Sequence, residues 1–101
     1  MARMQRKVVD ALDVIRCEAG RGLIREEVWQ TPNGEIVRYN LAFICHGLFQ
    51  RDHGRVLGYD NRHGMHHRHE RGIVTPYPFT TYEEVLTRFL EEVDLLRKEK
   101  L

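Results

Sequence analysis

Apolar residues recur at steps of three and four along residues 3–19, namely Met4, Val8, Leu12, Ile15 and Ala19. Charged residues fill most positions between them, so this spacing predicts a helix with one apolar stripe. Gly20 and Gly22 follow directly and are expected to end the helix. We therefore expect an N-terminal helix over residues 1–20.

A β-hairpin is predicted next. Residues 23–30 are rich in Ile, Val and Trp, which favour strands. They lead to Asn33-Gly34, a strong signal for a tight turn between antiparallel strands. Residues 36–45 form the returning strand, and the apolar side chains at its odd positions are expected to face a core. The even positions are mixed, so Arg38 and Asn40 should project from the opposite face.

The segment that follows extends this hairpin into a meander. Residues 51–54 have the composition of a turn, and residues 55–59 have that of a third antiparallel strand. Residues 66–70 are short enough to be either extended or irregular. Pro76 and Pro78 indicate an extended connection at the edge of the sheet, because proline cannot donate a ladder hydrogen bond.

A second helix is predicted at the C-terminal end. Thr80 with Glu83 and Thr81 with Glu84 both fit a capping box, which marks a helix start. One face of this helix is apolar, at Tyr82, Val85, Leu86, Phe89, Val93 and Leu96. The whole pattern predicts an α+β fold, with an antiparallel meander sheet of three to four strands flanked by an N-terminal and a C-terminal helix.

The length of 101 residues limits this fold to a single domain over residues 1–101. The longest apolar run, residues 41–45, is far shorter than the roughly 20 residues that span a membrane, and the first residues lack the pattern of a signal peptide. Cys17 and Cys45 stand apart without the spacing of a metal or redox motif, which suits a reducing compartment. We therefore expect a cytoplasmic protein without a membrane partner.

The net charge of +1 hides an uneven distribution of charged and titratable residues. Residues 51–71 contain five arginines against three acidic residues, together with five of the six histidines. Histidine changes its charge near neutral pH, so it is the usual general acid or base and a common metal ligand. Arginine binds phosphate through paired hydrogen bonds. This combination indicates chemistry on a phosphate group.

Alternation along the histidine-rich segment suggests how its side chains are arranged. If residues 66–69 are extended, His67 and His69 face one side, and His66 and Arg68 face the other. His67 and His69 are then expected to act together.

Three uses of this cluster are compatible with its composition. Histidine and arginine suffice for RNA cleavage without a metal, in which an acid and a base move protons and a cation stabilises the charge on phosphorus. Alternatively, Asp60, His67 and His69 bind a divalent metal that activates water for hydrolysis. In the third use, the cluster only binds phosphates and performs no chemistry.

The cluster and the segment after it resemble the TumE family of toxins. The resemblance is carried by Tyr59-Asp60-Asn61, His63-Gly64, His67-Arg68-His69, and Pro78-Phe79-Thr80 before an acidic amphipathic helix. It covers residues 23–96, so the helix expected before Gly20 is interpreted as an extension of the family core. The resemblance implies a small cytoplasmic toxin that is neutralised by a helix-turn-helix antitoxin. Both a homodimer and a toxin–antitoxin hetero-oligomer fit this interpretation.

The resemblance matches polar residues at Asp60, Asn61, His63, His67, Arg68 and His69, and extends to His66. The polar face of the sheet adds Arg38 and the arginine-rich segment adds Arg62. The candidate catalytic residues are Asp60, His63, His67, Arg68 and His69, and the candidate substrate-binding residues are Arg38, Asn61, Arg62 and His66. We expect His67 and His69 to form the acid/base pair and Asp60 to orient an imidazole by accepting its second N–H. Arg68 or Arg38 is expected to bind the phosphate. The expected function is cleavage of an RNA substrate without an obligatory metal or other cofactor.

Overall fold

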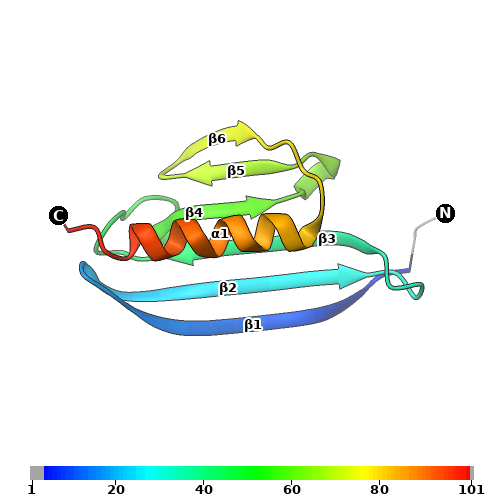
Figure 1. The fold of residues 1–101 in the computed structure, drawn as a ribbon, viewed down its shortest axis with the longest axis horizontal. Coiled ribbons are helices and arrows are strands. Elements are labelled where there is room, and N and C mark those ends of the chain that lie inside the picture. The colour runs from blue at the N-terminus through cyan, green and yellow to red at the C-terminus, as the bar shows by residue number, and fades with distance from the viewer. Residues whose placement is uncertain (1–3, 101) are drawn as a thin grey trace.

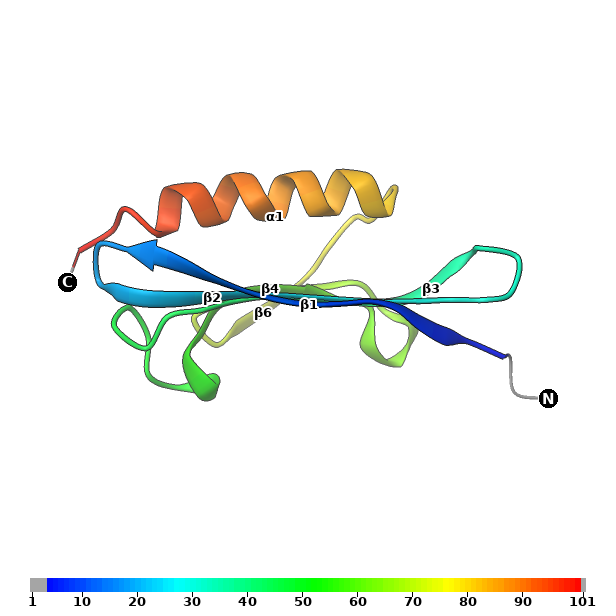
Figure 2. The ribbon, with the colours of Figure 1, turned by 90° about the horizontal axis from the view of Figure 1, so that it is seen from below.

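A six-stranded antiparallel sheet with a helix packed on one face is the architecture of the computed structural model, which describes residues 4–100 (Figures 1 and 2). The strands pair in chain order, from β1 at one edge to β6 at the other. They are β1 (Arg6–Cys17), β2 (Gly20–Gln30), β3 (Ile36–Ile44), β4 (Arg55–Asp60), β5 (His67–Glu70) and β6 (Ile73–Pro76), and the helix is α1 (Tyr82–Leu96). The α+β class and the antiparallel meander are thus confirmed.

The predicted N-terminal helix is wrong, because this part of the chain is strand β1. It pairs with β2 from Arg6 opposite Gln30 to Cys17 opposite Gly20. The turn between them is short, and Gly20 has a φ of 128°, a conformation that favours glycine. Residues 1–3 lie outside the described residues, so the comparison with the expected helix covers residues 4–19.

This segment forms a strand despite its helical spacing, because its apolar residues also fit the period of two that a strand requires. The less exposed side chains of β1 are Val9, Ala11, Ile15 and Cys17, all on one face of the strand. Asp13, a charged residue on the same face, interrupts this alternation, so the helical spacing is the clearer of the two patterns in the sequence. Three members of the predicted helical stripe, Met4, Val8 and Leu12, are exposed. The pairing with β2 decides between two patterns that the segment itself allows.

The prediction of three to four strands is wrong as well, because the sheet has six. The strands expected at 23–30, 36–45 and 55–59 correspond to β2, β3 and β4. Two short strands follow, β5 and β6, with four residues each. Segments this short carry little periodicity, so their strand character depends on the neighbours with which they pair. Pro76 ends β6 at the sheet edge, in agreement with the expected edge position.

One face of the sheet forms the core together with α1. The helix begins after Thr81, whose side-chain oxygen accepts a hydrogen bond of 3.1 Å from the backbone N–H of Glu84. Its buried residues Val85, Phe89, Val93 and Leu96 pack on Tyr39, Leu41, Phe43, Leu57 and Tyr59 of the sheet. We call the face away from α1 the open face (Figure 2). In the part of the chain that the structure describes, no helix is both long and apolar enough to cross a membrane.

Candidate functional site

The strand register aligns five polar residues on the open face. Asp10 lies opposite Glu27, Glu27 opposite Asn40, Asn40 opposite Asp60, and Asp60 opposite His67. Tyr39 and Leu41, on either side of Asn40, point into the core, so alternation places this line of residues on the other face. Strands lie about 4.8 Å apart, so the line extends over about 19 Å. We call these five residues the polar row.

A cleft of about 310 Å³ opens beside the middle of the polar row. It is lined by Glu27, Trp29, Arg38, Tyr39, Asn40, Arg55, Asp60 and Arg62. These residues come from β2, β3, β4 and the turn after β4. Two of the arginines were predicted to bind substrate, whereas Glu27, Trp29 and Arg55 were not assigned a role from the sequence. The register of β2 against β3, set by the Asn33-Gly34 turn, could have placed Glu27 and Trp29 here.

Two arginines of the cleft carry charge that the protein leaves unneutralised. Arg38 and Arg62 make no ion pair with any residue between 4 and 100. The Arg38 guanidinium lies over the Trp29 ring, 4.4 Å from its centroid, and the Lys7 ammonium lies 5.1 Å from the same centroid. An aromatic face favours a nearby cation without cancelling its charge. Arg38 and Arg62 are therefore available to an anion.

Glu27 lines the cleft and binds two cations outside its lining, Lys7 and Arg25. Its carboxylate pairs with Lys7 at 2.6 Å and with Arg25 at 3.2 Å, and it accepts a 3.0 Å hydrogen bond from Asn40. Burial opposes the charge of Glu27, but these hydrogen bonds more than offset it and lower its pKa to about 2. Glu27 thus stays ionised at neutral pH and is suited to holding Lys7 and Asn40 in place rather than to proton transfer.

A chain of charged groups fixes His69 next to the polar row. Asp52 pairs with Arg55 at 2.8 Å, Arg55 Nη2 donates to His69 Nδ1 at 3.2 Å, and His69 Nε2 lies 2.9 Å from Asp60 Oδ2. An arginine only donates, so Nδ1 is the acceptor and the proton of neutral His69 lies on Nε2. Nε2 is buried, and the angle of its contact with Asp60 falls outside hydrogen-bond geometry. Burial and then the charge of Arg55 lower the pKa of His69, against the opposing effect of Asp60.

Gly58 gives Arg55 the room to make this contact. The Arg55 side chain passes over Gly58, and a Cβ at this position would lie 3.0 Å from Arg55 Cδ. Gly58 also lies opposite His69 in the register of β4 and β5. A side chain at residue 58 would therefore crowd both Arg55 and the Leu41 carbonyl oxygen, which lies 3.2 Å from the same Cβ position.

His67 differs from His69 in lacking hydrogen bonds and ion pairs. It is partly exposed on the open face, and its ring centroid lies 6.3 Å from that of His69. Its ring makes no hydrogen bond or ion pair within the described chain. Neither ring nitrogen of His67 is therefore held by a hydrogen bond or ion pair of the described residues.

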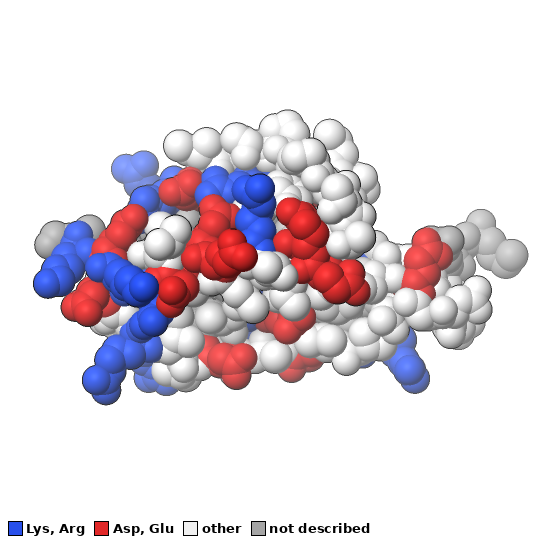
Figure 3. All heavy atoms as spheres, in the orientation of Figure 1, with Lys and Arg blue, Asp and Glu red and all other residues white. Residues whose placement is uncertain are grey.

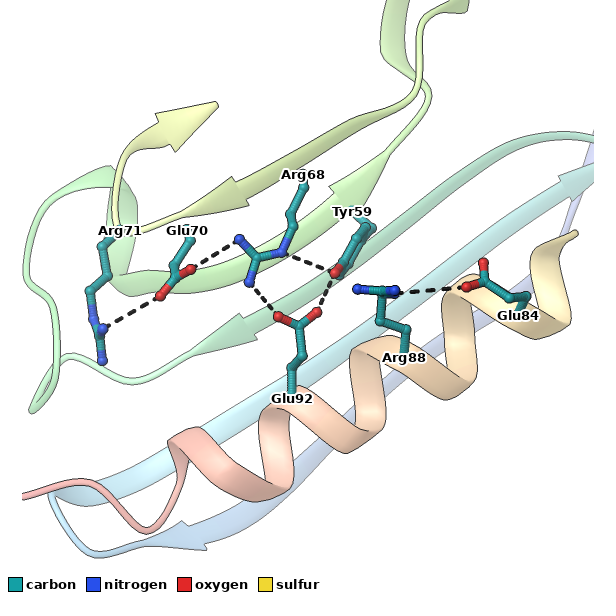
Figure 4. A network of polar contacts seen from close by, with 7 residues as sticks. All are labelled: Tyr59, Arg68, Glu70, Arg71, Glu84, Arg88 and Glu92. Atoms are coloured by element: carbon teal, nitrogen blue, oxygen red, sulfur yellow. Dashed lines mark hydrogen bonds and ion pairs between the residues drawn. The ribbon is translucent and has the colours of Figure 1, made fainter. Parts of the chain in front are cut away.

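Arg68 and His66 lie on the other side of the sheet, as alternation along this segment predicts. Arg68 Nε donates to the Tyr59 hydroxyl at 3.0 Å and Nη1 donates to Glu70 at 2.9 Å, while Nη2 pairs with Glu92 of α1 (Figure 4). The Tyr59 hydroxyl also donates to Glu92. This network ties α1 to β4 and β5, so Arg68 lies away from His67 and His69.

The environment of His66 is aromatic. Its ring stacks on Phe79 with a centroid distance of 4.0 Å, and Nδ1 lies 2.9 Å from the Tyr39 hydroxyl. Burial, followed by the charge of His67, lowers the pKa of His66. The structure therefore gives His66 a packing role.

The turn after β4 holds the three other predicted residues. The Asn61 side chain bridges to β3: Oδ1 accepts from Tyr39 N and Nδ2 donates to the Val37 carbonyl, both at 3.0 Å. Arg62 reaches the cleft, and its backbone N–H donates to Asp60 at 3.1 Å. His63 is exposed with a φ of 61°.

Replacing Asn61 by alanine is expected to lower the free energy of unfolding by about 1–2 kcal/mol, because the Tyr39 N–H and the Val37 carbonyl lose their side-chain partner. Urea unfolding measures this change. Thr87→Ala on the exposed side of α1 serves as the control, and equal stabilities of the two variants would contradict a structural role for the Asn61 amide.

The alternative metal site is not assembled as a three-ligand group. Among residues 4–100, no three His, Cys, Asp or Glu side chains are placed so that they could hold a metal ion. Asp60 and His69 are in contact, and His67 lies opposite Asp60 without joining them.

Comparison with known proteins identifies one family. The model of the family described as Toxin TumE matches residues 3–97, nearly the whole chain. The matched range includes β1, which the resemblance in the sequence left out. No curated protein and no solved structure gives a significant match.

Proposed function

The chain belongs to the TumE family of toxins, and from this premise we propose that it is a ribonuclease whose active surface is the polar row with its cleft. The observation that supports this most is the gathering of a free histidine, His67, with two unpaired arginines, Arg38 and Arg62, on one face of the sheet. Family membership also implies an antitoxin partner, which we propose to be a helix-turn-helix protein. Because the proposed target is RNA, we propose that the toxin acts in the cytoplasm.

Phosphate binding is assigned to the cleft. The two unpaired arginines can donate paired hydrogen bonds to phosphate oxygens. The face with α1 is less suited to this role, because it carries Glu83, Glu84, Glu91, Glu92 and Asp94 among its basic residues (Figure 3). The cleft also has carboxylates, Glu27 and Asp60, but its three arginines outnumber them, so the balance of charge favours phosphate binding in the cleft.

Base binding is assigned to Trp29, which lies beside Arg38 in the cleft. A nucleobase can stack on an aromatic ring whatever its sequence, and such stacking contributes about 1–3 kcal/mol per base. Arg38 and Lys7 lie over this ring, so a base would stack on Trp29 once a bound phosphate draws the Arg38 guanidinium off it.

Cleavage without a metal requires two proton transfers. The 2′-hydroxyl loses its proton and attacks the adjacent phosphorus, the bond from phosphorus to the 5′-oxygen breaks, and that oxygen takes up a proton. We assign one transfer to His67. His69 becomes the second group when a bound phosphate draws Arg55 away from Nδ1, because a phosphate is a stronger partner for a guanidinium than a neutral imidazole. Asp60 Oδ2 lies 2.9 Å from His69 Nε2 outside hydrogen-bond geometry, and it would orient His69 once the release of Arg55 lets the ring shift and brings the Nε2 proton into line with it.

The proposal is tested with purified protein, a short RNA and total RNA, in the presence and absence of EDTA. We expect wild-type protein to cleave in EDTA and to leave 2′,3′-cyclic phosphate ends. Arg38→Ala/Arg62→Ala is expected to lose cleavage by tenfold or more, because both unpaired arginines of the cleft are gone. The matched control is Arg21→Ala, which removes one exposed arginine at the far end of β2.

Other outcomes separate the competing functions. Cleavage that EDTA abolishes would favour a metal-dependent nuclease in which Asp60, His67 and His69 rearrange into ligands. Salt-dependent RNA binding without any product would favour a binding module. Equal activity of the double variant and Arg21→Ala would contradict the placement of the site in the cleft.

A further inference from the structure

The two edges of the sheet differ in how they are protected. At one edge, β6 is only four residues long and ends at Pro76, which suppresses pairing with another strand. At the other edge, β1 has 12 residues, and its register irregularity is confined to Lys7–Val9 (Figure 1). Residues 9–17 contain neither proline nor glycine. They form a long regular edge whose outward N–H and C=O groups can pair with a further strand.

The exposed side chains along this edge can contact those of a further strand. Leu12 and Val14 are 54% and 59% exposed and lie on the open face. Arg16 is exposed on the same strand and makes no ion pair with residues 4–100. Asp10, at the other end of this stretch, is also exposed, and it pairs with Lys7 at 3.4 Å and with Arg25 at 3.0 Å within the chain. The edge thus has a cation at one end, an acid at the other, and two apolar side chains between them.

We propose that β1 pairs antiparallel with β1 of a second copy of this chain, about a two-fold axis at Asp13. Such an axis is perpendicular to the sheet, so each face continues across the junction. In this register Arg16 lies opposite Asp10 of the partner copy, and Val14 lies opposite Leu12 of the partner copy. Both pairs occur twice, and directly opposite residues in antiparallel strands are in side-chain contact.

The two neighbouring registers that also keep both open faces on the same side do not pair the charges and the apolar side chains in this way. With the axis at Leu12, Val14 lies opposite Asp10 and Arg16 lies opposite Val8. With the axis at Val14, Arg16 lies opposite Leu12. Only the axis at Asp13, among these three, pairs both the charges and the apolar side chains. Its cost is that the two Asp13 carboxylates meet at the axis, where like charges repel.

In this dimer the proposed active surfaces of the two copies lie on the same side. Because the axis is perpendicular to the sheet, the two open faces point in the same direction on one continuous twelve-stranded sheet, six strands from each copy. The two polar rows then face the same side, and both helices lie on the other. The pairing itself does not depend on whether the polar row cleaves RNA.

Sedimentation of the full chain over a range of concentrations tests the dimer. We expect wild type to dimerise, and Leu12→Lys to raise the dissociation constant at least tenfold. The matched control is Val74→Lys on β6, because Val74 has the same exposed fraction of 54% as Leu12. A monomeric wild type would overturn the proposal and leave the edge to another partner, such as the antitoxin. A dimer that Leu12→Lys leaves unchanged would overturn it too.

A cysteine at the axis tests the register. Asp13→Cys brings two thiols together at the axis, within the Cα separation of 4.4–6.8 Å that a disulfide requires. Oxidation with diamide should therefore crosslink this variant, and circular dichroism checks its fold. Thr75→Cys on β6 is the control and should remain uncrosslinked. Failure of Asp13→Cys to crosslink more than Thr75→Cys would overturn the axis at Asp13.

Discussion

Replacing His67 by alanine is expected to lower the rate of RNA cleavage about 100-fold or more, the usual effect of losing a general acid or base. The His67 ring makes no hydrogen bond or ion pair among the described residues and only a ring contact with His69, so its loss leaves the surrounding polar contacts in place. The melting temperature should therefore change little. Initial rates on a short RNA measure the effect.

The matched control for His67 is His53→Ala, which removes another exposed histidine in the turn before β4. It should retain wild-type activity. His67→Ala/His69→Ala should be inactive in the cleavage assay and non-toxic in cells that lack the antitoxin. Full toxicity of this double variant would exclude both histidines from the reaction and would leave phosphate binding as the function of the open face.

Phe89→Ala is expected to have the largest effect on stability, a loss of about 4 kcal/mol in the free energy of unfolding. The Phe89 side chain is completely buried and meets the Tyr59 ring edge-on, with centroids 6.3 Å apart. Its removal leaves a cavity between α1 and β4, where the helix is attached to the sheet. Denaturant unfolding monitored by circular dichroism measures the loss.

Leu95→Ala controls for the loss of an apolar side chain on the same helix, because Leu95 is 69% exposed. It should change stability by less than about 1 kcal/mol. If Phe89→Ala had an equally small effect, α1 would not contribute the core packing described above. At temperatures where both variants are folded, their RNA cleavage should match that of wild type, because the polar row lies on the other face.

The hairpin of β2 and β3 and the start of α1 were predictable because their signals are local. Asn33-Gly34 favours a tight turn in any context, and Thr81 caps a helix through a backbone N–H three residues away. Alternation in β3 likewise separated the core side chains from Arg38 and Asn40. It also separated His67 and His69 from His66 and Arg68 once that segment was taken as extended.

The N-terminal strand was not predictable in the same way. The helical spacing from Met4 to Ala19 is present in the sequence, yet the chain gains more from pairing β1 with β2 along their length. A strand on its own makes no ladder hydrogen bonds, so its stability depends on a neighbour that the local pattern does not contain. The short strands β5 and β6 were under-predicted for the same reason.

The sequence by itself determined the chemistry available to this protein: a histidine-rich segment, the arginines around it, and an alternation that sorts both by face. Only the tertiary structure decided which of them meet. The register of four strand pairs brings Asp10, Glu27 and Asn40 into line with Asp60 and His67. Alternation already places Arg68 on the other face, and the packing of α1 there gives it Glu92 as a partner. Side-chain type is a local property, whereas proximity across a sheet depends on pairing between residues far apart in the chain.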